Sequence, residues 1–321
     1  MVFILIEGVA KMRTVSPSEY ISTPRPTLHW LIDGLIPRPG YMLLLGPPKV
    51  GKSFLAWDMA CKIASGKSVM GYSCSGGPQK VIYLQLDTKE AAWTLRLKSL
   101  ADSGYNLEIP NLRLVHPDDM MLPLLITTER GQAFIRQLME IENPALVVLD
   151  VLREVHQDDE NDSTAMKKVF DCLERAFGNT SVLILHHTRK MSIEDKASPD
   201  PVSLARGSSY ITGRVDGYWL LYGEGPNRKL FFESRFQESS LTSARQDPST
   251  GLFSFPDLEQ DATLTPQLVT MCSLNPNRPH TSLWKDASAK YGISRSTYYR
   301  LLAGVKCCHI TSFQASHGIP A

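Results

Sequence analysis

The segment YMLLLGPPKVGKSFLA, residues 41–56, runs from an apolar stretch through a glycine-bracketed loop into a second, mostly apolar stretch. The loop has the pattern G-x-x-x-x-G-K-[ST], with its fixed positions at Gly46, Gly51, Lys52 and Ser53. Between a strand and a helix, this pattern indicates a phosphate-binding loop. Glycine lets the backbone curl so that successive N–H groups face phosphate oxygens, while the lysine reaches the outer phosphates.

The loop predicts that the chain binds ATP with Mg²⁺, and a chance match in a turn rich in glycine and proline is the alternative. Its position argues against chance, because an apolar run typical of a strand precedes it and a helical period follows. Ser53 is the Mg²⁺ ligand expected within the loop. The residues expected to surround the nucleotide are Gly46, Pro47, Pro48, Lys49, Val50, Gly51, Lys52, Ser53 and Phe54.

Short apolar runs alternate with longer helical periods between residues 27 and 223. The runs are nearly continuous, which is typical of parallel strands covered on both faces. Residues 166–177 instead place apolar side chains at helical spacing. The chain is therefore predicted to be α/β with a mostly parallel sheet. The expected parallel strands are 41–46, 80–87, 112–115, 145–150, 181–187 and 217–223, with antiparallel strands at 228–235 and 251–255 added at the edge.

Two of these strand ends carry the acids that phosphoryl transfer needs. Asp150 follows an apolar run at the carboxyl end of a strand, where ligands collect in open α/β sheets, so it is the second expected Mg²⁺ ligand. Asp87 ends the second expected strand and is the candidate base for water, with Glu90 as the neighbouring alternative. In the alternative structural interpretation, Asp150 is a helix cap and Asp87 caps a helix that starts near Lys89.

Composition excludes several protein classes. The chain has 321 residues, of which 43% are hydrophobic and 21% charged, as in an ordinary globular protein with one large domain and a smaller one. No apolar run reaches the roughly 18 residues of a membrane span, so we expect a cytoplasmic protein without a membrane partner. Its six cysteines lack metal-ligand spacing and are interpreted as reduced thiols.

The net charge of +1 conceals an asymmetry. Residues 262–321 carry six Lys or Arg and a single acid, Asp286, whereas the rest of the chain has 28 bases and 32 acids. A basic tail on a mildly acidic body predicts an anionic partner for the tail.

The basic segment 281–305 is predicted to form a helix, a turn and a second helix. Thr281 or Ser282 is the expected cap of the first helix, and Gly292 lies at the corner. The buried face is expected to contain Leu283, Ala287, Ile293, Tyr298, Leu301 and Leu302. A helix-turn-helix or winged-helix DNA-binding domain is one interpretation, and a helical module for docking proteins is the other. The expected DNA contacts are Arg295, Ser296, Thr297 and Tyr299.

The domain boundaries follow from these segments. A polar stretch flanked by proline at 256–266 is a predicted linker. The expected divisions are an N-terminal extension over 1–26, the α/β ATPase domain over 27–255, the linker, the helix-turn-helix-like domain over 267–305 and a disordered tail over 306–321.

Five motifs occur in an order and at a spacing that resemble those of RepA-type hexameric replicative helicases, within the RecA-like ATPase superfamily. They are GPPKVGKS, VIYLQLD, LVVLDVLREVHQDDENDS, LILHHTRK and LARGSSYITGRVDGYW, and they cover about residues 28–236. The resemblance implies a RecA-like core, a ring around DNA, and a nucleotide held between neighbouring subunits. It places Lys52 and Ser53 on phosphate and Mg²⁺, and Asp150 on the metal.

The same resemblance implies roles for three other positions. His186 and His187 end the strand that senses the γ-phosphate, and Arg206 matches an arginine that reaches into the neighbouring subunit's site. The family usually has a glutamate where this chain has Asp87, and a shorter carboxylate implies a slower base. Without the resemblance, a surface salt bridge and a hydrogen-bonded pair at a strand end explain the arginine and the histidines.

The loop between the histidines and Arg206 is polar and about 18 residues long, as functional or flexible loops are. In RecA-like proteins it faces the central channel, where Arg189 and Lys190 are expected to contact single-stranded DNA; a solvated loop is the alternative. The predicted function is a hexameric ATP-driven helicase. A recombination or repair ATPase that coats DNA, or a DNA-binding regulator with a nucleotide switch, remains open.

Overall fold

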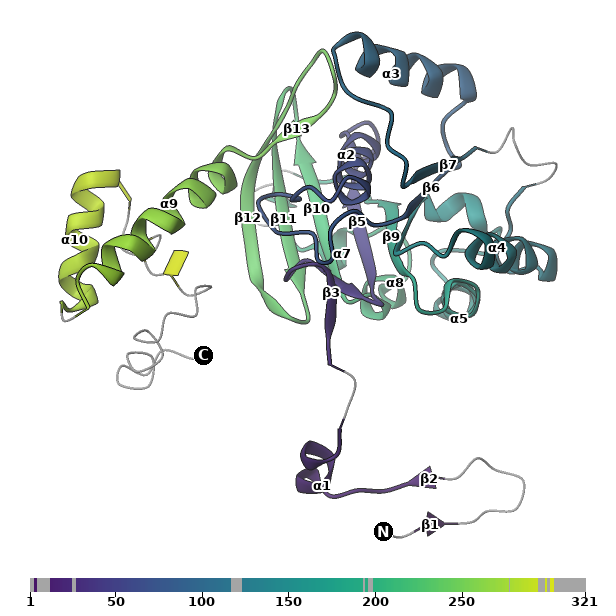
Figure 1. Cartoon of the computed structure of the whole chain (residues 1–321). Coiled ribbons are helices and arrows are strands. Elements are labelled where there is room, and N and C mark those ends of the chain that lie inside the picture. The colour runs from purple at the N-terminus through teal and green to yellow at the C-terminus, as the bar shows by residue number, and fades with distance from the viewer. Residues whose placement is uncertain are drawn as a thin grey trace.

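A nine-stranded sheet forms the centre of the structure (Figure 1). The computed structural model describes residues 3–4, 12–24, 27–116, 123–192, 194–195, 199–276, 278–293, 298 and 301–302. In spatial order the strands are β13 (Phe253–Ser254), β12 (Gln237–Gln246), β11 (Asn227–Ser234), β10 (Gly217–Gly223), β5 (Tyr41–Gly46), β9 (Ser181–His187), β8 (Leu146–Asp150), β6 (Val81–Gln85) and β7 (Leu112–Val115).

The six strands from β10 to β7 are mutually parallel. They correspond to the six runs predicted as parallel strands, so the large, mostly parallel sheet expected for a RecA-like core is confirmed. β11 and β13 are the two antiparallel strands expected at the edge. β12, which lies between them, was not predicted. β6 ends at Gln85, two residues earlier than the expected strand, and Asp87 therefore lies beyond it.

Helices cover both faces of the sheet. One core contains residues of α2 (Lys52–Ala64) and α3 (Glu90–Asp102), and the other contains residues of α4 (Glu129–Glu142), α5 (Ser163–Phe177), α7 (Pro201–Leu204) and α8 (Ser209–Arg214). Along β5, Met42 and Leu44 face the first core, while Leu43 and Leu45 face the second. This double burial explains why the strands are continuous apolar runs.

α5 is the helix predicted from apolar spacing between the fourth and fifth parallel strands. The Asp162 side chain caps it by accepting hydrogen bonds from the backbone N–H groups of Thr164 and Ala165. The apolar residues that defined the period are all buried: Met166, Val169, Phe170, Leu173 and Phe177. Between β8 and this helix runs a short 3-10 helix, η2 (Leu152–Val155).

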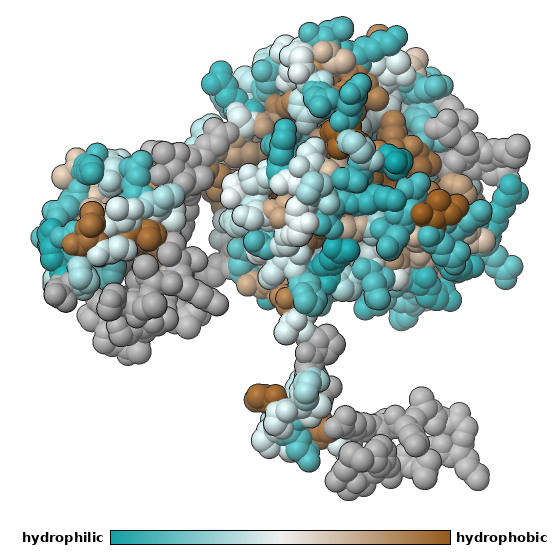
Figure 2. Space-filling view, in the orientation of Figure 1, coloured by the Kyte–Doolittle hydropathy of each residue, from teal (hydrophilic) through white to brown (hydrophobic). Residues whose placement is uncertain are grey.

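The N-terminal extension carries β1 (Phe3–Ile4), β2 (Met12–Arg13) and α1 (Pro17–Ser22), and α1 buries none of its residues. In Figure 1 these elements lie apart from the sheet. A hairpin of β3 (His29–Ile32) and β4 (Ile36–Arg38) then leads into β5. On the face seen in Figure 2, hydrophilic residues cover much of the sheet domain and interrupt the hydrophobic regions.

Two helices follow the sheet and project from its β12–β13 side (Figure 1): α9 (Pro256–Ser273) and α10 (His280–Tyr291). The segment expected as a linker, 256–266, instead forms the first 11 of the 18 residues of α9. Pro279, rather than Thr281 or Ser282, occupies the N-cap of α10, so that capping prediction is wrong. Gly292 ends the helix in the left-handed conformation, with φ 67°, as its expected corner position requires.

A third cluster of buried side chains joins α9 to α10 and to the described residues beyond Gly292. It includes all six side chains expected on the buried face of this segment. The expected DNA contacts Arg295, Ser296, Thr297 and Tyr299 lie outside the described residues, as does the tail 306–321, so the helix-turn-helix stays a prediction. In the part of the chain that the structure describes, every helix is too short or too polar to span a lipid bilayer.

Candidate nucleotide-binding site

The loop between β5 and α2 has the geometry that its glycines predict. A Cβ atom on Gly46 would lie 2.5 Å from the carbonyl oxygen of Leu221, so a larger residue does not fit beside β10. Gly51 has φ +101°, a conformation that glycine adopts readily. It is the N-cap of α2 and provides no side chain to cap it. The positive end of α2 therefore faces the loop, as anion binding requires.

Lys52 is 5% exposed, and its ammonium is held inside the loop. Nζ donates hydrogen bonds to the carbonyl oxygens of Gly46 at 2.9 Å and Pro47 at 3.0 Å, and to His187 Nδ1 at 3.2 Å. Burial lowers the pKa of Lys52 to about 8, although the charges of Asp150 and Asp87 oppose this shift. The two predicted acids therefore lie within electrostatic reach of the loop lysine.

His187 ends β9 as a half-buried side chain. Burial, followed by the charge of Lys52, lowers the pKa of His187 to about 4. The imidazole is therefore neutral at pH 7, and its Nδ1 accepts a hydrogen bond from the lysine ammonium. The structure thus brings the predicted sensor histidine to the P-loop lysine.

Asp150, at the end of β8, is 1% exposed. The Tyr83 hydroxyl donates to its Oδ2 at 2.8 Å, and Oδ1 is buried without a complete hydrogen bond. Burial raises the pKa of Asp150, whereas hydrogen bonding from the hydroxyls of Tyr83 and Ser53 lowers it. Mg²⁺ prefers one or two protein oxygens plus phosphate. A buried carboxylate with one oxygen available as a ligand, beside a serine hydroxyl, suits this ion. Ser53 and Asp150 are the residues that would hold this ion.

The end of β6 lies beside the end of β8, with Gln85 paired in register with Asp150. Gln85 is fully buried, and its Oε1 accepts a hydrogen bond from the backbone N–H of Asp87 at 3.2 Å. Asp87 is exposed, and its charge raises the pKa of both Lys52 and Asp150. The N-cap of α3 is Lys89, without a side-chain cap, so the interpretation of Asp87 as a helix cap is wrong. Glu90 is the first residue of α3 and is exposed.

The two histidines at the end of β9 have different surroundings. His186 is buried, and its Nε2 donates to the carbonyl oxygen of Arg206 at 2.7 Å. The backbone N–H of Arg206 in turn donates to the carbonyl oxygen of His187 at 3.0 Å. Arg206 is therefore fixed by its backbone to the strand that contacts Lys52. Its side chain is 64% exposed, with Nε 3.5 Å from Glu160 Oε2.

Arg189, the first predicted DNA contact of the loop, already has partners in this chain. Its two terminal nitrogens bind the Asp195 carboxylate at 2.9 and 3.0 Å, and Nε donates to the carbonyl oxygen of Ser203. Lys190 is exposed. In the described part of this loop, Arg189 is thus paired with an acid, whereas Lys190 lies on the surface.

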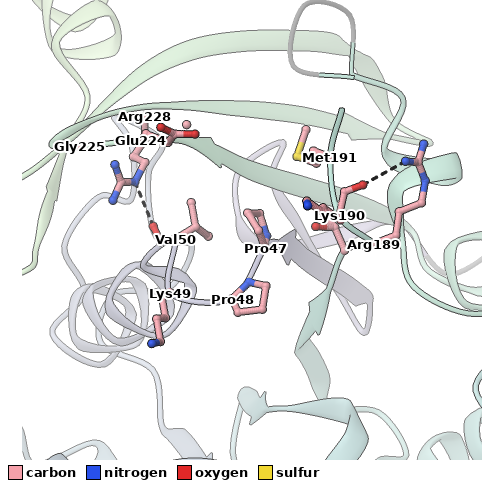
Figure 3. A pocket seen from close by; sticks show the side chains of 12 residues that line it. Pro47, Pro48, Lys49, Val50, Arg189, Lys190, Met191, Glu224, Gly225 and Arg228 are labelled. Carbon is pink, nitrogen blue, oxygen red and sulfur yellow. Dashed lines mark hydrogen bonds between the residues drawn. The ribbon is translucent and has the colours of Figure 1, made fainter. Parts of the chain in front are cut away.

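A pocket of about 660 Å³ opens beside the P-loop, and Figure 3 shows its lining. The P-loop forms one side, the residues after β9 form another, and the turn between β10 and β11 forms the third. Arg228 Nε donates to the carbonyl oxygen of Val50 at 3.3 Å and ties this turn to the loop. Four cations and one acid line the pocket, which suits an anionic ligand: Lys49, Arg189, Lys190, Arg228 and Glu224.

Sequence reasoning missed several polar side chains of this site. Tyr83 and Gln85 had a usable signal, because they alternate with apolar residues in VIYLQ and so share one face of β6. Glu160 had none, since it stands among other acids in QDDEND. Arg228 belongs to a hairpin whose distance from the loop depends on the order of the strands.

Comparison with known proteins agrees with the site. The sequence model of a protein family described as "AAA domain" matches residues 9–192, more than half of the chain. The match includes the P-loop, Asp150 and His187. One similar solved structure is that of the KaiC-like protein PH0186 from the hyperthermophilic archaeon Pyrococcus horikoshii OT3, with 14% identity and a TM-score of 0.46, covering 70% of this chain and 93% of that one. The family match and the loop geometry identify a nucleotide-binding P-loop ATPase, and the chain belongs to the AAA domain family.

Proposed function

We propose that this protein is an ATP-driven DNA motor, a hexameric replicative helicase of the RepA type that moves along single-stranded DNA. The observation that carries the proposal is the position of Arg206. Its guanidinium is largely exposed, while its backbone is bonded to both histidines at the tip of β9. An exposed arginine on a rigid support is what a neighbouring subunit's nucleotide site requires, since a cation supplied in trans offsets the charge of the transferring phosphoryl group.

Within one subunit, the geometry of the nucleotide site suggests a separate role for each residue. Lys52 exchanges its loop carbonyls for the outer phosphates, and the amides of the loop hold the remaining oxygens. Ser53 and Asp150 would hold Mg²⁺, which would supply positive charge beside the phosphate oxygens. Asp87 accepts the proton of the attacking water. It is exposed, and it is near enough for its charge to raise the pKa of both Lys52 and Asp150. His187 is neutral at pH 7 and contacts Lys52, so it responds when phosphate binds the lysine.

DNA binding is proposed at two places. Lys190 and Arg189 follow β9 and would face the channel of a ring, with Asp195 released from Arg189 when phosphate takes its place. The C-terminal segment 262–321, which has six Lys or Arg and a single acid, would bind duplex DNA. A helix-turn-helix around Arg295, Ser296, Thr297 and Tyr299 is part of this proposal.

Strand displacement from a forked DNA substrate, measured beside ATP turnover with and without single-stranded DNA, tests the function. The proposal expects DNA to stimulate phosphate release and the fork to separate only with ATP, and it expects Lys52→Ala to lose both activities. Stimulated turnover without separation would identify a protein that coats DNA. Binding of ATP without phosphate release on any DNA would identify a nucleotide switch and contradict the motor.

A further inference from the structure

Glu160 is a buried carboxylate that lies next to Arg206, and the proposed function gives it no role. It is 5% exposed and follows η2 in the segment that leads to α5. Its Oε2 is 3.5 Å from Arg206 Nε, and its Oε1 is 3.9 Å from His156 Nε2 and 4.0 Å from His186 Nδ1. Oε1 is buried without a hydrogen bond. A buried carboxylate is costly unless a cation or several donors accompany it.

The two histidines do not supply that cation. Burial lowers the pKa of His156 and of His186, which favours their neutral forms. His186 donates its Nε2 proton to the carbonyl oxygen of Arg206, so in the neutral form its Nδ1 faces Glu160 with a lone pair. The charges near His156 are those of Arg153 and Asp158, and the charge near His186 besides Arg206 is that of Lys52. Arg206 is therefore the cation that compensates Glu160.

The backbone also fixes Arg206 against Glu160. The N–H of Ser208 donates to the carbonyl oxygen of Glu160 at 2.6 Å. Between them, Gly207 has φ +89°, and a Cβ atom there would lie 2.5 Å from the same carbonyl oxygen. The backbone around Arg206 is thus bound to β9 and to the Glu160 segment, and this fixes the position of the Arg206 Cα atom.

The contact with Glu160 uses Nε, the nitrogen nearest the stem of the guanidinium. This leaves the two terminal amino groups for another partner, and those groups form the fork that binds phosphate oxygens. A carboxylate placed at Nε therefore orients the fork without occupying it.

We propose that Glu160 is a positioning residue that orients Arg206 toward the nucleotide of the neighbouring subunit. This inference rests on the proposed function, in which Arg206 acts between subunits. It assigns Glu160 an effect on the neighbour's turnover and none on nucleotide binding in its own subunit.

The test compares the kcat and the KM for ATP of wild type, Glu160→Gln, Arg206→Ala and the double variant. Glu160→Gln should lower kcat by at least about tenfold with little change in KM, because a misplaced group costs rate rather than ground-state binding. The double variant should be no slower than Arg206→Ala alone. The matched control is Glu154→Gln, an exposed glutamate of η2, which should keep wild-type turnover.

Mixed oligomers separate positioning from a general structural defect. Lys52→Ala subunits are inactive but keep Glu160 and Arg206, so mixing them with Glu160→Gln subunits should restore turnover. Glu160→Asp keeps the negative charge but moves it away from Arg206, so it should lower kcat less, and mixing with Lys52→Ala subunits should also restore its turnover. This variant serves the same test if Glu160→Gln does not fold. Wild-type kcat in Glu160→Gln, an additive loss in the double variant, or no recovery on mixing would overturn the inference. If Arg206→Ala itself keeps full turnover, the proposed function fails, and the role of Glu160 fails with it.

Discussion

Lys52 Nζ and His187 Nδ1 lie 3.2 Å apart, which joins the P-loop to the end of β9. The same strand end holds Arg206 through two backbone contacts. When phosphate binds Lys52, the contact of the lysine with His187 therefore changes. His187 and the adjacent His186 both hold the backbone of Arg206. This short path connects a subunit's own nucleotide to the residue that we propose it offers to the next subunit.

The buried ammonium of Lys52 predicts a pH dependence of stability. Its pKa is about 8 in the folded protein and 10.5 in the reference state, so the unfolded chain binds more protons between these values. The free energy of unfolding therefore rises with pH in this window, and the contribution is lost as the pH falls through 8. Relative to Lys52→Met, wild type should gain about 2 kcal/mol between pH 8 and pH 10.

Urea unfolding of both proteins at several pH values measures this difference. Lys52→Met is a suitable reference because it removes the titrating ammonium and keeps an unbranched side chain. It also removes the three hydrogen bonds of the ammonium, so the pH dependence of the difference, rather than its absolute size, reports the titration of Lys52. A difference between the two proteins that stays constant from pH 8 to pH 10 would show that the lysine is not desolvated as its position indicates.

Tyr83→Phe should weaken the Mg²⁺ site. The hydroxyl donates to Asp150 Oδ2 and lies 3.3 Å from the carbonyl oxygen of Ser53, so it connects the two expected metal ligands. Loss of such an outer partner raises the Mg²⁺ concentration for half-maximal turnover by about tenfold. An Mg²⁺ titration of ATPase activity measures it, with Tyr222→Phe, on β10 and also buried, as control. Equal Mg²⁺ requirements in all three proteins would count against this role of Tyr83.

Removal of residues 262–321 should separate DNA binding from basal turnover. The cut leaves Asp257, whose carboxylate accepts a hydrogen bond from the N–H of Ser243, and Leu258, which packs against the sheet core. Because the deleted part carries a charge of about +5, affinity for duplex DNA at low salt should fall by about tenfold or more. Basal ATPase activity should stay within about twofold, since the described apolar residues of the deleted part pack against one another in a cluster of their own.

Fluorescence anisotropy with labelled duplex, together with the mass of the particle in solution, checks this prediction. Unchanged duplex affinity would argue that the segment does not bind DNA. An oligomer that falls apart on truncation would instead identify it as a docking module between subunits.

The strands and the P-loop could be predicted from the sequence because their signals are local. A parallel strand buried on both faces is a continuous apolar run, and the loop motif spans eight residues. β12 escaped prediction because QESSLTSARQ is polar apart from Leu241 and one alanine, as an outer strand can be. Residues 256–266 were expected as a linker because they are polar and flanked by proline, but they form the first eleven residues of α9, and a helix can accommodate one interior proline.

The surroundings of the site could be predicted only in part. Asp150 and His187 are strand ends of one sheet, so their convergence on Lys52 follows from topology. The burial of Glu160, which has three other acids beside it in QDDEND, depends on how the η2 segment and the Arg206 segment pack together, and so does the difference between His186 and His187. Such contacts between distant parts of the chain leave no periodic pattern in the sequence.

In the proposed function, a complete nucleotide site combines Lys52 and Asp150 of one subunit with Arg206 of another. Its most direct test is ATP turnover in mixtures of Lys52→Ala and Arg206→Ala, each inactive alone, over the full range of ratios. Activity should appear in the mixtures and be greatest at intermediate ratios, where an Arg206→Ala subunit with an intact P-loop adjoins a Lys52→Ala subunit with an intact arginine. Mixtures that co-assemble and bind ATP, yet never exceed the two variants alone, would contradict it.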